Sequence, residues 1–397
     1  MVAMNQTTPP ADAANLNNQG MNALRAQDFA AAEQFFVQAT AMDPNASALW
    51  RNLATARRAQ SNDGGELEAL DAAVNADRMD FMAWLRKAEL HQRIGEEAQA
   101  LAAWQGVLQL ATQMGELPSE ISAALVNGRQ FVSVATSRIA EAADEVLVQF
   151  ADQLDETEQR RTRAFVELAT GRRMLYLNHC DGLHYPFLPA DEFFDRHHFP
   201  WMEALDSAAP EIRSELQALL ADSGEAMRPY IRMDKGLPDN KWSPLDHSLD
   251  WGACFLWEYG EPNQPVLDRC PATAAALAAL PSARIPGRTP SAFFSILKPH
   301  TRIPPHTGVT NTRAIVHLPL IVPPNCGFRV GGETREWQEG CAFAFDDTIE
   351  HEAWNESDNL RAVLIFDVWN PHLTAVEQQF IKRYFAAADR TGLNPAH

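Results

Sequence analysis

The chain has 397 residues and a formal net charge of −19, and it contains no run approaching the ~20 apolar residues of a membrane-spanning helix. Because this length exceeds a typical domain of ~100 to 200 residues, we expect two or three folded units. The acidic balance argues against a nucleic-acid or anionic-membrane surface, since such surfaces need clustered Lys and Arg. The five cysteines form no CxxC pair, which favours reduced thiols in a cytoplasmic protein over a disulfide framework or a zinc site.

Residues 13–114 repeat with a period of 34. Leu16, Trp50 and Trp84, for example, are related by this step. A 34-residue period with aromatic and small residues at fixed positions resembles the tetratricopeptide (TPR) repeat, in which helix pairs stack because no pair buries its apolar face alone. The resemblance implies a helical solenoid of the kind that docks peptides or proteins. A spacer or a dimerisation element is the alternative.

The segments on either side of the repeats carry weaker signals. Residues 1–12 lack the basic flank and apolar segment of a secretory signal, so we predict a short disordered lead. Residues 115–175 have apolar side chains at helical spacing and are predicted to form a helical cap or linker. Residues 176–397 are predicted to form the second unit, in which 211–220 and 375–389 are helices.

Short runs rich in Val, Ile, Phe and Trp follow one another between Ser291 and Pro371, separated by Pro, Gly, Asn and Asp. This composition predicts six or more β-strands, and strands at such close spacing indicate an antiparallel sandwich or barrel. Gly331 and Gly332 stand between two of these runs and permit the positive φ angles of a tight hairpin. The whole chain is therefore predicted to be an α+β multidomain protein.

Three side chains at or near the ends of these strands carry potential chemistry, namely His306, His351 and Arg361. Neutral imidazoles on neighbouring strands suit iron, zinc, copper or nickel as ligands. A guanidinium nearby suits a carboxylate, which it can hold through two parallel hydrogen bonds. On spacing alone the alternative is a loop histidine, an exposed strand histidine and a surface ion pair.

Alternation along the strands predicts which side chains share a face, because successive residues point to opposite sides. The three predicted sets are Arg313, Ile315 and His317; Arg361, Val363 and Ile365; and Phe293, Ser295 and Leu297. Charged and hydroxyl groups that repeatedly accompany apolar residues are typical of a barrel interior that holds a small anionic ligand.

The segments FFSILKPHTRIPPHTGVTNTR, VHLPLIVP and FDDTIEHEAWNESDNLRAVLIFDVWNPHLT resemble the catalytic domain of the aspartyl/asparaginyl β-hydroxylase family, most strongly from Asp246 to Thr374. The resemblance implies a double-stranded β-helix (cupin-like) fold. It also implies a dioxygenase that uses Fe(II), 2-oxoglutarate and O2 to hydroxylate Cβ of Asp or Asn residues in a peptide or protein.

The same resemblance assigns roles to individual residues. His306 and His351 match the iron ligands of the family. Ser295 and Arg361 match the residues that hold the distal carboxylate of 2-oxoglutarate. His317 matches a residue near the 1-carboxylate of this cosubstrate.

Three further positions bear on the predicted site. Better-known animal members carry an arginine where this chain has Ile315, and we predict that Arg313 on the same strand face substitutes for it. Gly308 stands where the common facial triad of iron oxygenases has a carboxylate, and the resembled family is known for lacking that carboxylate. A position without a carboxylate also leaves room for a halide, so chlorination is an alternative reaction.

The substrate is predicted from position alone. Asp246, His247 and Ser248 fall where members of the family approach their substrate, and we predict that they contact it. Related bacterial domains also resemble lipid A acyl-chain hydroxylases, so a lipid or a small molecule is an alternative substrate. A non-catalytic TPR scaffold with a retired enzyme domain is the remaining alternative, and the retention of both histidines and of the arginine argues against it.

Overall fold

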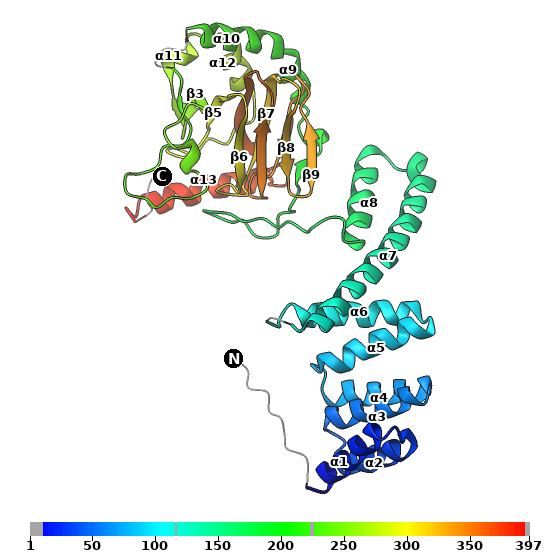
Figure 1. Cartoon of the computed structure of the whole chain (residues 1–397). Helices are drawn as coiled ribbons and strands as arrows, with labels where there is room; N and C mark the ends of the chain where they lie inside the picture. The colour runs from blue at the N-terminus through cyan, green and yellow to red at the C-terminus, as the bar shows by residue number, and fades with distance from the viewer. Residues whose placement is uncertain (1–10, 116, 223–225, 394–397) are drawn as a thin grey trace. The chain divides into compact units, whose positions relative to one another are not determined.

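The computed structural model describes residues 11–115, 117–222 and 226–393. The chain divides into two compact units, Met1–Asp155 and Glu156–His397 (Figure 1). The first is built of helices and the second of antiparallel β-sheets with flanking helices, which confirms the predicted fold class. Residues 1–10 of the predicted lead lie outside the described residues, and the first helix begins at Ala11.

The first unit is a stack of helix hairpins. Its helices are α1 (Ala11–Arg25), α2 (Phe29–Met42), α3 (Ser47–Ala59), α4 (Asp63–Ala76), α5 (Phe81–Ile94), α6 (Glu97–Ala111) and α7 (Ser119–Phe150). Each packs against the next along the chain, as expected for TPR-like repeats. Small residues allow the close approach: a Cβ on Gly20 of α1 would lie 2.6 Å from the ring of Phe36 in α2.

The segment predicted as a helical cap or linker is divided between the two units. Helix α7 continues the stack against α6, where a Cβ on Gly128 would lie 2.3 Å from Trp104. A short 3₁₀ turn, Ala151–Gln153, follows α7. The next helix, α8 (Glu156–Ala169), belongs to the second unit.

The second unit contains twelve strands and five more α-helices among its described residues. The strands are β1 (Phe193–Phe194), β2 (Arg228–Pro229), β3 (Trp251–Glu258), β4 (Glu261–Pro262), β5 (Ala292–Leu297), β6 (Thr301–His306), β7 (Arg313–Ile321), β8 (Cys326–Val330), β9 (Glu333–Glu336), β10 (Phe343–Phe345), β11 (His351–Asn355) and β12 (Arg361–Trp369). The helices after α8 are α9 (Met202–Ser207), α10 (Ala209–Ala221), α11 (Gln264–Leu267), α12 (Pro271–Ala278) and α13 (Ala375–Asp389).

Strands β5 to β12 form the double-stranded β-helix that the sequence predicts. The large sheet has the order β1-β10-β7-β12-β5-β3-β2, and the small sheet has the order β6-β11-β8-β9. The chain therefore passes between the sheets as two interleaved Greek keys, which is the jelly-roll arrangement. Gly331 has a φ of 54° in the two-residue connection between β8 and β9, so the predicted tight hairpin is confirmed.

Two apolar clusters hold this unit together. Helices α9, α10 and α12 cover the outer face of the large sheet, where Val316, Phe294 and Leu364 are buried beneath them (Figure 1). A second cluster, which includes Phe328 and Phe345, fills the space between the two sheets. This inner cluster does not fill it completely, and the remaining space is the cavity described next.

Candidate active site

A cavity of about 550 Å³ opens between the two sheets of the second unit. All of the residues predicted to hold a metal or a cosubstrate line it: Ser295, His306, Arg313, His317, His351 and Arg361. The strand alternation predicted from the sequence therefore assigns these side chains to the correct face. The alternative of an exposed histidine and a surface ion pair is wrong, because His351 is 7% exposed and Arg361 is 1% exposed.

The two histidines are directly paired across β6 and β11. His306 and His351 are register partners, and their ring centroids lie 4.0 Å apart. The Nδ1 of His306 bonds the carbonyl of Pro304 at 2.8 Å, and that of His351 bonds the carbonyl of Ile349 at 3.0 Å. Because a carbonyl oxygen only accepts, each Nδ1 carries the proton and each Nε2 keeps its lone pair. This tautomer is the one that metal-binding histidines use.

Burial keeps both rings neutral. It lowers the pKa of His306 to about 4 and that of His351 well below its ordinary value, and each also feels a neighbouring positive charge. Two adjacent neutral imidazoles with fixed tautomers form a ready pair of metal ligands. In the part of the chain that the structure describes, no group of three or more His, Cys, Asp and Glu side chains is arranged to hold a metal ion.

Asp347 is a residue of this site that the sequence analysis missed. It lines the cavity, and a Cβ on Gly308 would lie 2.0 Å from its Oδ2. Burial raises the pKa of this carboxyl to about 7, and Oδ1 has no hydrogen-bond partner among the described residues. The sequence has a glycine at position 308, where the common facial triad of iron oxygenases has a carboxylate. In the structure the Asp347 carboxylate, from the loop before β11, fills the space beside Gly308.

The sequence offers one clue to the role of Asp347, because Asp346 and Asp347 stand next to each other before β11. Asp346 takes the role expected of a turn residue, since its Oδ1 accepts hydrogen bonds from the backbone and hydroxyl of Thr348. One carboxylate is enough for that turn. The second is therefore free to point into the cavity.

Arg361 lies buried at another part of the cavity with unused donors. Its Nε and Nη1 have no hydrogen-bond partner among the described residues, and its guanidinium carbon lies 4.4 Å from the ring centroid of Trp337. His317 stacks on the same ring at 5.4 Å, and its Nδ1 and the Trp337 Nε1 also lack partners in the described chain. Burial lowers the pKa of Arg361 to about 10. Buried donors that converge without acceptors are the mark of a site for an anion.

Ser295 and Arg313 already have protein partners. The Ser295 hydroxyl accepts a hydrogen bond from Trp251 Nε1 at 3.1 Å. The Arg313 Nη1 lies 2.6 Å from the buried Asp367 carboxylate, which also accepts from Thr289. The positive charge of Arg313 is therefore balanced, whereas that of Arg361 is not.

The residues predicted to contact the substrate lie outside the cavity lining. Asp246 accepts a hydrogen bond from the backbone of Met233, and His247 is an exposed residue with a φ of 52°. Ser248 accepts from the backbone of Asp250. These side chains shape the turn before β3, which starts at Trp251.

Comparison with known proteins shows what this part of the chain is similar to. Residues 206–371 match the aspartyl/asparaginyl beta-hydroxylase family, so the resemblance seen in the sequence is confirmed for this unit.

Two relatives illustrate the range of the match. Over 188 residues the chain is 34% identical to the aspartyl/asparaginyl beta-hydroxylase of Mus musculus, which covers 45% of this chain and 24% of that protein. Over 193 residues it is 36% identical to the ornithine lipid ester-linked acyl 2-hydroxylase of Rhizobium tropici, which covers 48% of this chain and 64% of that protein. The chain thus spans less than two thirds of the length of either relative.

Two solved structures that are similar to part of the chain are TPR domains. One is the first TPR of Spaghetti (RPAP3) bound to an HSP90 peptide, at 18% identity and a TM-score of 0.27, covering 30% of this chain and 91% of that one. Another is the Sgt2 TPR domain of Aspergillus fumigatus, at 17% identity and a TM-score of 0.29, covering 34% and 88%. Within the first unit, the pairing of successive helices itself defines the repeat fold.

Proposed function

We propose that the second unit is an Fe(II)- and 2-oxoglutarate-dependent dioxygenase that hydroxylates a C–H bond next to a carbonyl carbon. The observation that carries the proposal is a buried arginine with unsatisfied donors in the same cavity as two adjacent neutral imidazoles. The donor set fits the two groups: imidazole nitrogen suits Fe(II), and a guanidinium suits a carboxylate.

In this proposal His306 and His351 hold the iron through Nε2. Arg361 takes the distal carboxylate of 2-oxoglutarate, with Ser295 beside it, and His317 lies near the 1-carboxylate. When bound, iron and 2-oxoglutarate supply the oxidising chemistry, in which O2 is consumed and 2-oxoglutarate becomes succinate and CO2. The chain itself orients the cosubstrate and excludes water, because the side chains that would hold it are almost fully buried.

Asp347 and Arg313 also line the cavity that holds the proposed metal. Arg313, paired with Asp367, helps to balance the acidic groups around the site. Asp347 fills the space at Gly308 in which a halide would sit, and we therefore propose hydroxylation and not chlorination.

Two substrates are consistent with the reaction. The family name suggests Cβ of Asp or Asn, which carries a carboxyl or amide carbon, and the Rhizobium tropici relative acts on an ester-linked acyl chain at carbon 2. In both cases the reacting carbon is bonded to a carbonyl carbon. For the helical unit we propose docking of a peptide or protein partner, as predicted from its repeats.

The test is turnover of 2-oxoglutarate by the full-length protein. We expect succinate release that requires Fe(II) and O2 and falls more than about 100-fold in His306→Ala or His351→Ala, since even indirect loss of ligand support costs 10- to 100-fold. His300→Ala, which changes an exposed histidine paired with Asp358, is the matched control and should retain turnover. A wild-type protein without iron-dependent turnover would leave the non-catalytic scaffold as the correct alternative.

A further inference from the structure

A fully exposed aromatic ring stands at the tip of a turn in the second unit. Phe187 follows Pro186 in this turn, and its backbone has a φ of 68°. A turn with proline at its first central position and a positive φ at its second usually carries glycine or asparagine at the second, because other L side chains are strained there. Neither the strained backbone nor the exposed ring stabilises the fold, so both indicate a role outside it.

The turn is anchored on both sides. Tyr185 exchanges two hydrogen bonds with the side chain of Asn311 through its backbone, and its hydroxyl donates to Glu377 of α13 at 3.1 Å. On the other side, Leu188 packs against the apolar cluster that α13 helps to form. Phe187 stands between these two anchors and is therefore held beside α13.

The outer face of α13 adds further exposed apolar side chains. Val376, Phe380 and Tyr384 are spaced four residues apart, so they follow one another along one side of the helix, and they are 76%, 62% and 47% exposed. Ile381 of the same helix is buried against the second unit. We call Phe187, Val376, Phe380 and Tyr384 the apolar ridge. Single apolar residues are common on protein surfaces, whereas four large ones together mark a contact surface.

The cations beside the apolar ridge have no carboxylate partner among the described residues. Three exposed cations lie on α13 or directly after it: Lys382, Arg383 and Arg390. The carboxylates of the same segment are already engaged. Asp389 pairs with Arg288 at 2.6 Å. Glu377 accepts hydrogen bonds from Thr374 and Tyr185. An acidic chain, with a formal net charge of −19, thus has a local excess of unpaired positive charge here.

Helical spacing puts two of these cations on the side of the apolar ridge. Arg383 lies seven residues after Val376, and Arg390 lies seven residues after Arg383, so all three project from one side. Exposed rings interleaved with unpaired guanidinium groups suit the boundary of an anionic lipid bilayer, where rings enter the headgroup region and cations meet lipid phosphates. The negative charge of the whole chain opposes such contact only weakly, because charges more than about 8 to 10 Å away are largely screened at physiological salt.

We propose that the apolar ridge and its cations dock this protein peripherally on an anionic lipid surface. The rings of Phe187, Phe380 and Tyr384 enter the headgroup region, and Arg383 and Arg390 bind lipid phosphates. The inference concerns the surface on which the protein works. It does not depend on the reaction proposed above, and its test does not use turnover.

Flotation of the full-length protein with lipid vesicles tests the proposal. One set of vesicles contains phosphatidylcholine alone, and the other contains about one third phosphatidylglycerol, which supplies a negative surface potential. We expect the protein to float with the anionic vesicles, to float less as the salt concentration rises, and to bind the neutral vesicles at least about fivefold more weakly. Binding to neither set, or equal binding to both, overturns the proposal.

Two variants test the rings of the apolar ridge. Phe187→Asn removes the ring at the turn, and asparagine suits a positive φ, so the fold should be retained. Phe380→Asn removes the ring on α13. Each should weaken vesicle binding roughly tenfold, because apolar surface no longer leaves water. Phe165→Asn, at a 70% exposed helical position on α8, is the matched control and should bind as the wild type does. Unchanged binding by both ridge variants overturns the proposal.

A charge reversal tests the cations. Arg383→Glu should weaken binding to the anionic vesicles by more than about tenfold, since one favourable contact becomes repulsive. Arg129→Glu, which changes an exposed arginine of α7, is the control and should have no effect. Sedimentation without lipid examines the other occupant of this face, a second copy of the chain. A wild-type dimer that Phe380→Asn dissociates would overturn the lipid proposal, whereas a monomer in both cases supports it.

Discussion

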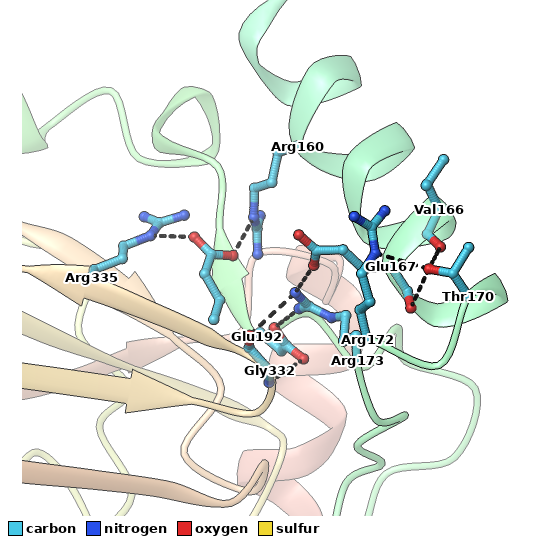
Figure 2. Close-up of polar contacts among 10 residues, drawn as sticks. Arg160, Val166, Glu167, Thr170, Arg172, Arg173, Glu192, Gly332 and Arg335 are labelled. Carbon is cyan, nitrogen blue, oxygen red and sulfur yellow. Dashed lines mark hydrogen bonds and ion pairs between the residues drawn. The ribbon is translucent and has the colours of Figure 1, made fainter. Parts of the chain in front are cut away.

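Two hollows of the second unit are each lined by three arginines or more, and they differ in whether the charges of those arginines are paired. The larger is a cleft of about 1160 Å³ beneath α8, lined by Arg160, Arg173 and Arg335. Arg160 and Arg335 bond Glu333 at 2.6 and 2.7 Å, and Arg173 pairs with Glu192. Figure 2 shows Arg173 beside Glu192, with Arg160 and Arg335 each joined to a carboxylate. In the smaller cavity Arg361 has two unsatisfied donors. Size therefore does not identify the site, whereas an unmatched buried charge does.

The largest expected effect is on the KM for 2-oxoglutarate, and it distinguishes the unpaired Arg361 of the cavity from the paired Arg173 of the cleft. Arg361→Lys should raise the KM for 2-oxoglutarate about tenfold or more, because a lysine cannot reproduce a two-point contact with a carboxylate. Arg173→Lys in the cleft is the matched control and should leave this KM unchanged. Direct titration of 2-oxoglutarate into both variants checks the comparison, and equal affinities would show that the clamp lies elsewhere.

A second prediction concerns the carboxylate beside the histidines. Gly308→Ala should lower the free energy of unfolding by about 1 to 3 kcal/mol, because the new Cβ overlaps the Asp347 carboxylate. In an Asp347→Ala background the same change should cost at least about 1 kcal/mol less, since contacting residues are coupled. Denaturant unfolding of the two single variants and the double variant measures the coupling. Additive effects would mean that the two residues do not compete for this space.

A smaller effect is expected at Ser295, whose hydroxyl already has a partner. Ser295→Ala removes the acceptor of the Trp251 hydrogen bond and should cost about 1 kcal/mol of stability. Its effect on the KM for 2-oxoglutarate should be weaker than that of Arg361→Lys. If the order of the two effects were reversed, Ser295 and not Arg361 would be the main contact with the cosubstrate.

The smallest effect concerns α8, which the ion pairs of the cleft hold in place. Burial raises the pKa of Glu333, but Arg335 and Arg160 lower it by more, so the net pKa lies below the ordinary value. A group with a depressed folded pKa stabilises the protein at neutral pH, and this stability is lost as the pH falls through that pKa. The protection factors of α8 amides, which correct the exchange rates for their intrinsic pH dependence, should therefore fall at acidic pH. Amides of α10, which buries Ile212, Leu216 and Leu219, should change less.

The inner faces of the barrel could be predicted because local rules determine them. Alternation along β5, β7 and β12 assigns Ser295, His317 and Arg361 to one cavity without knowledge of the sheet order. The positions of His306 and His351 were also predicted, since each stands at the end of its own strand. These features depend on short-range periodicity, which a single sequence contains.

Other features depend on contacts between distant residues. The sequence of α8 has the same helical spacing as α7, yet α8 belongs to the second unit because Arg160 bonds Glu333, far along the chain. Asp246 was predicted to contact the substrate, because nothing local reveals that it accepts a hydrogen bond from the backbone of Met233 and lies outside the cavity lining. The ring of Tyr230 likewise lies 5.2 Å from that of Phe293, and no sequence pattern specifies that approach.

The pairing of the two histidines has a consequence for how the barrel closes. Strand β6 is at the end of the small sheet, and its ladder with β11 is irregular between His351 and Ala353. A metal held by both imidazoles would cross-link β6 to β11 at this irregular ladder. At a free metal concentration 100 times the dissociation constant, this cross-link would raise the free energy of unfolding by about 2.7 kcal/mol. Metal loading would then stabilise the edge of the small sheet at the proposed site.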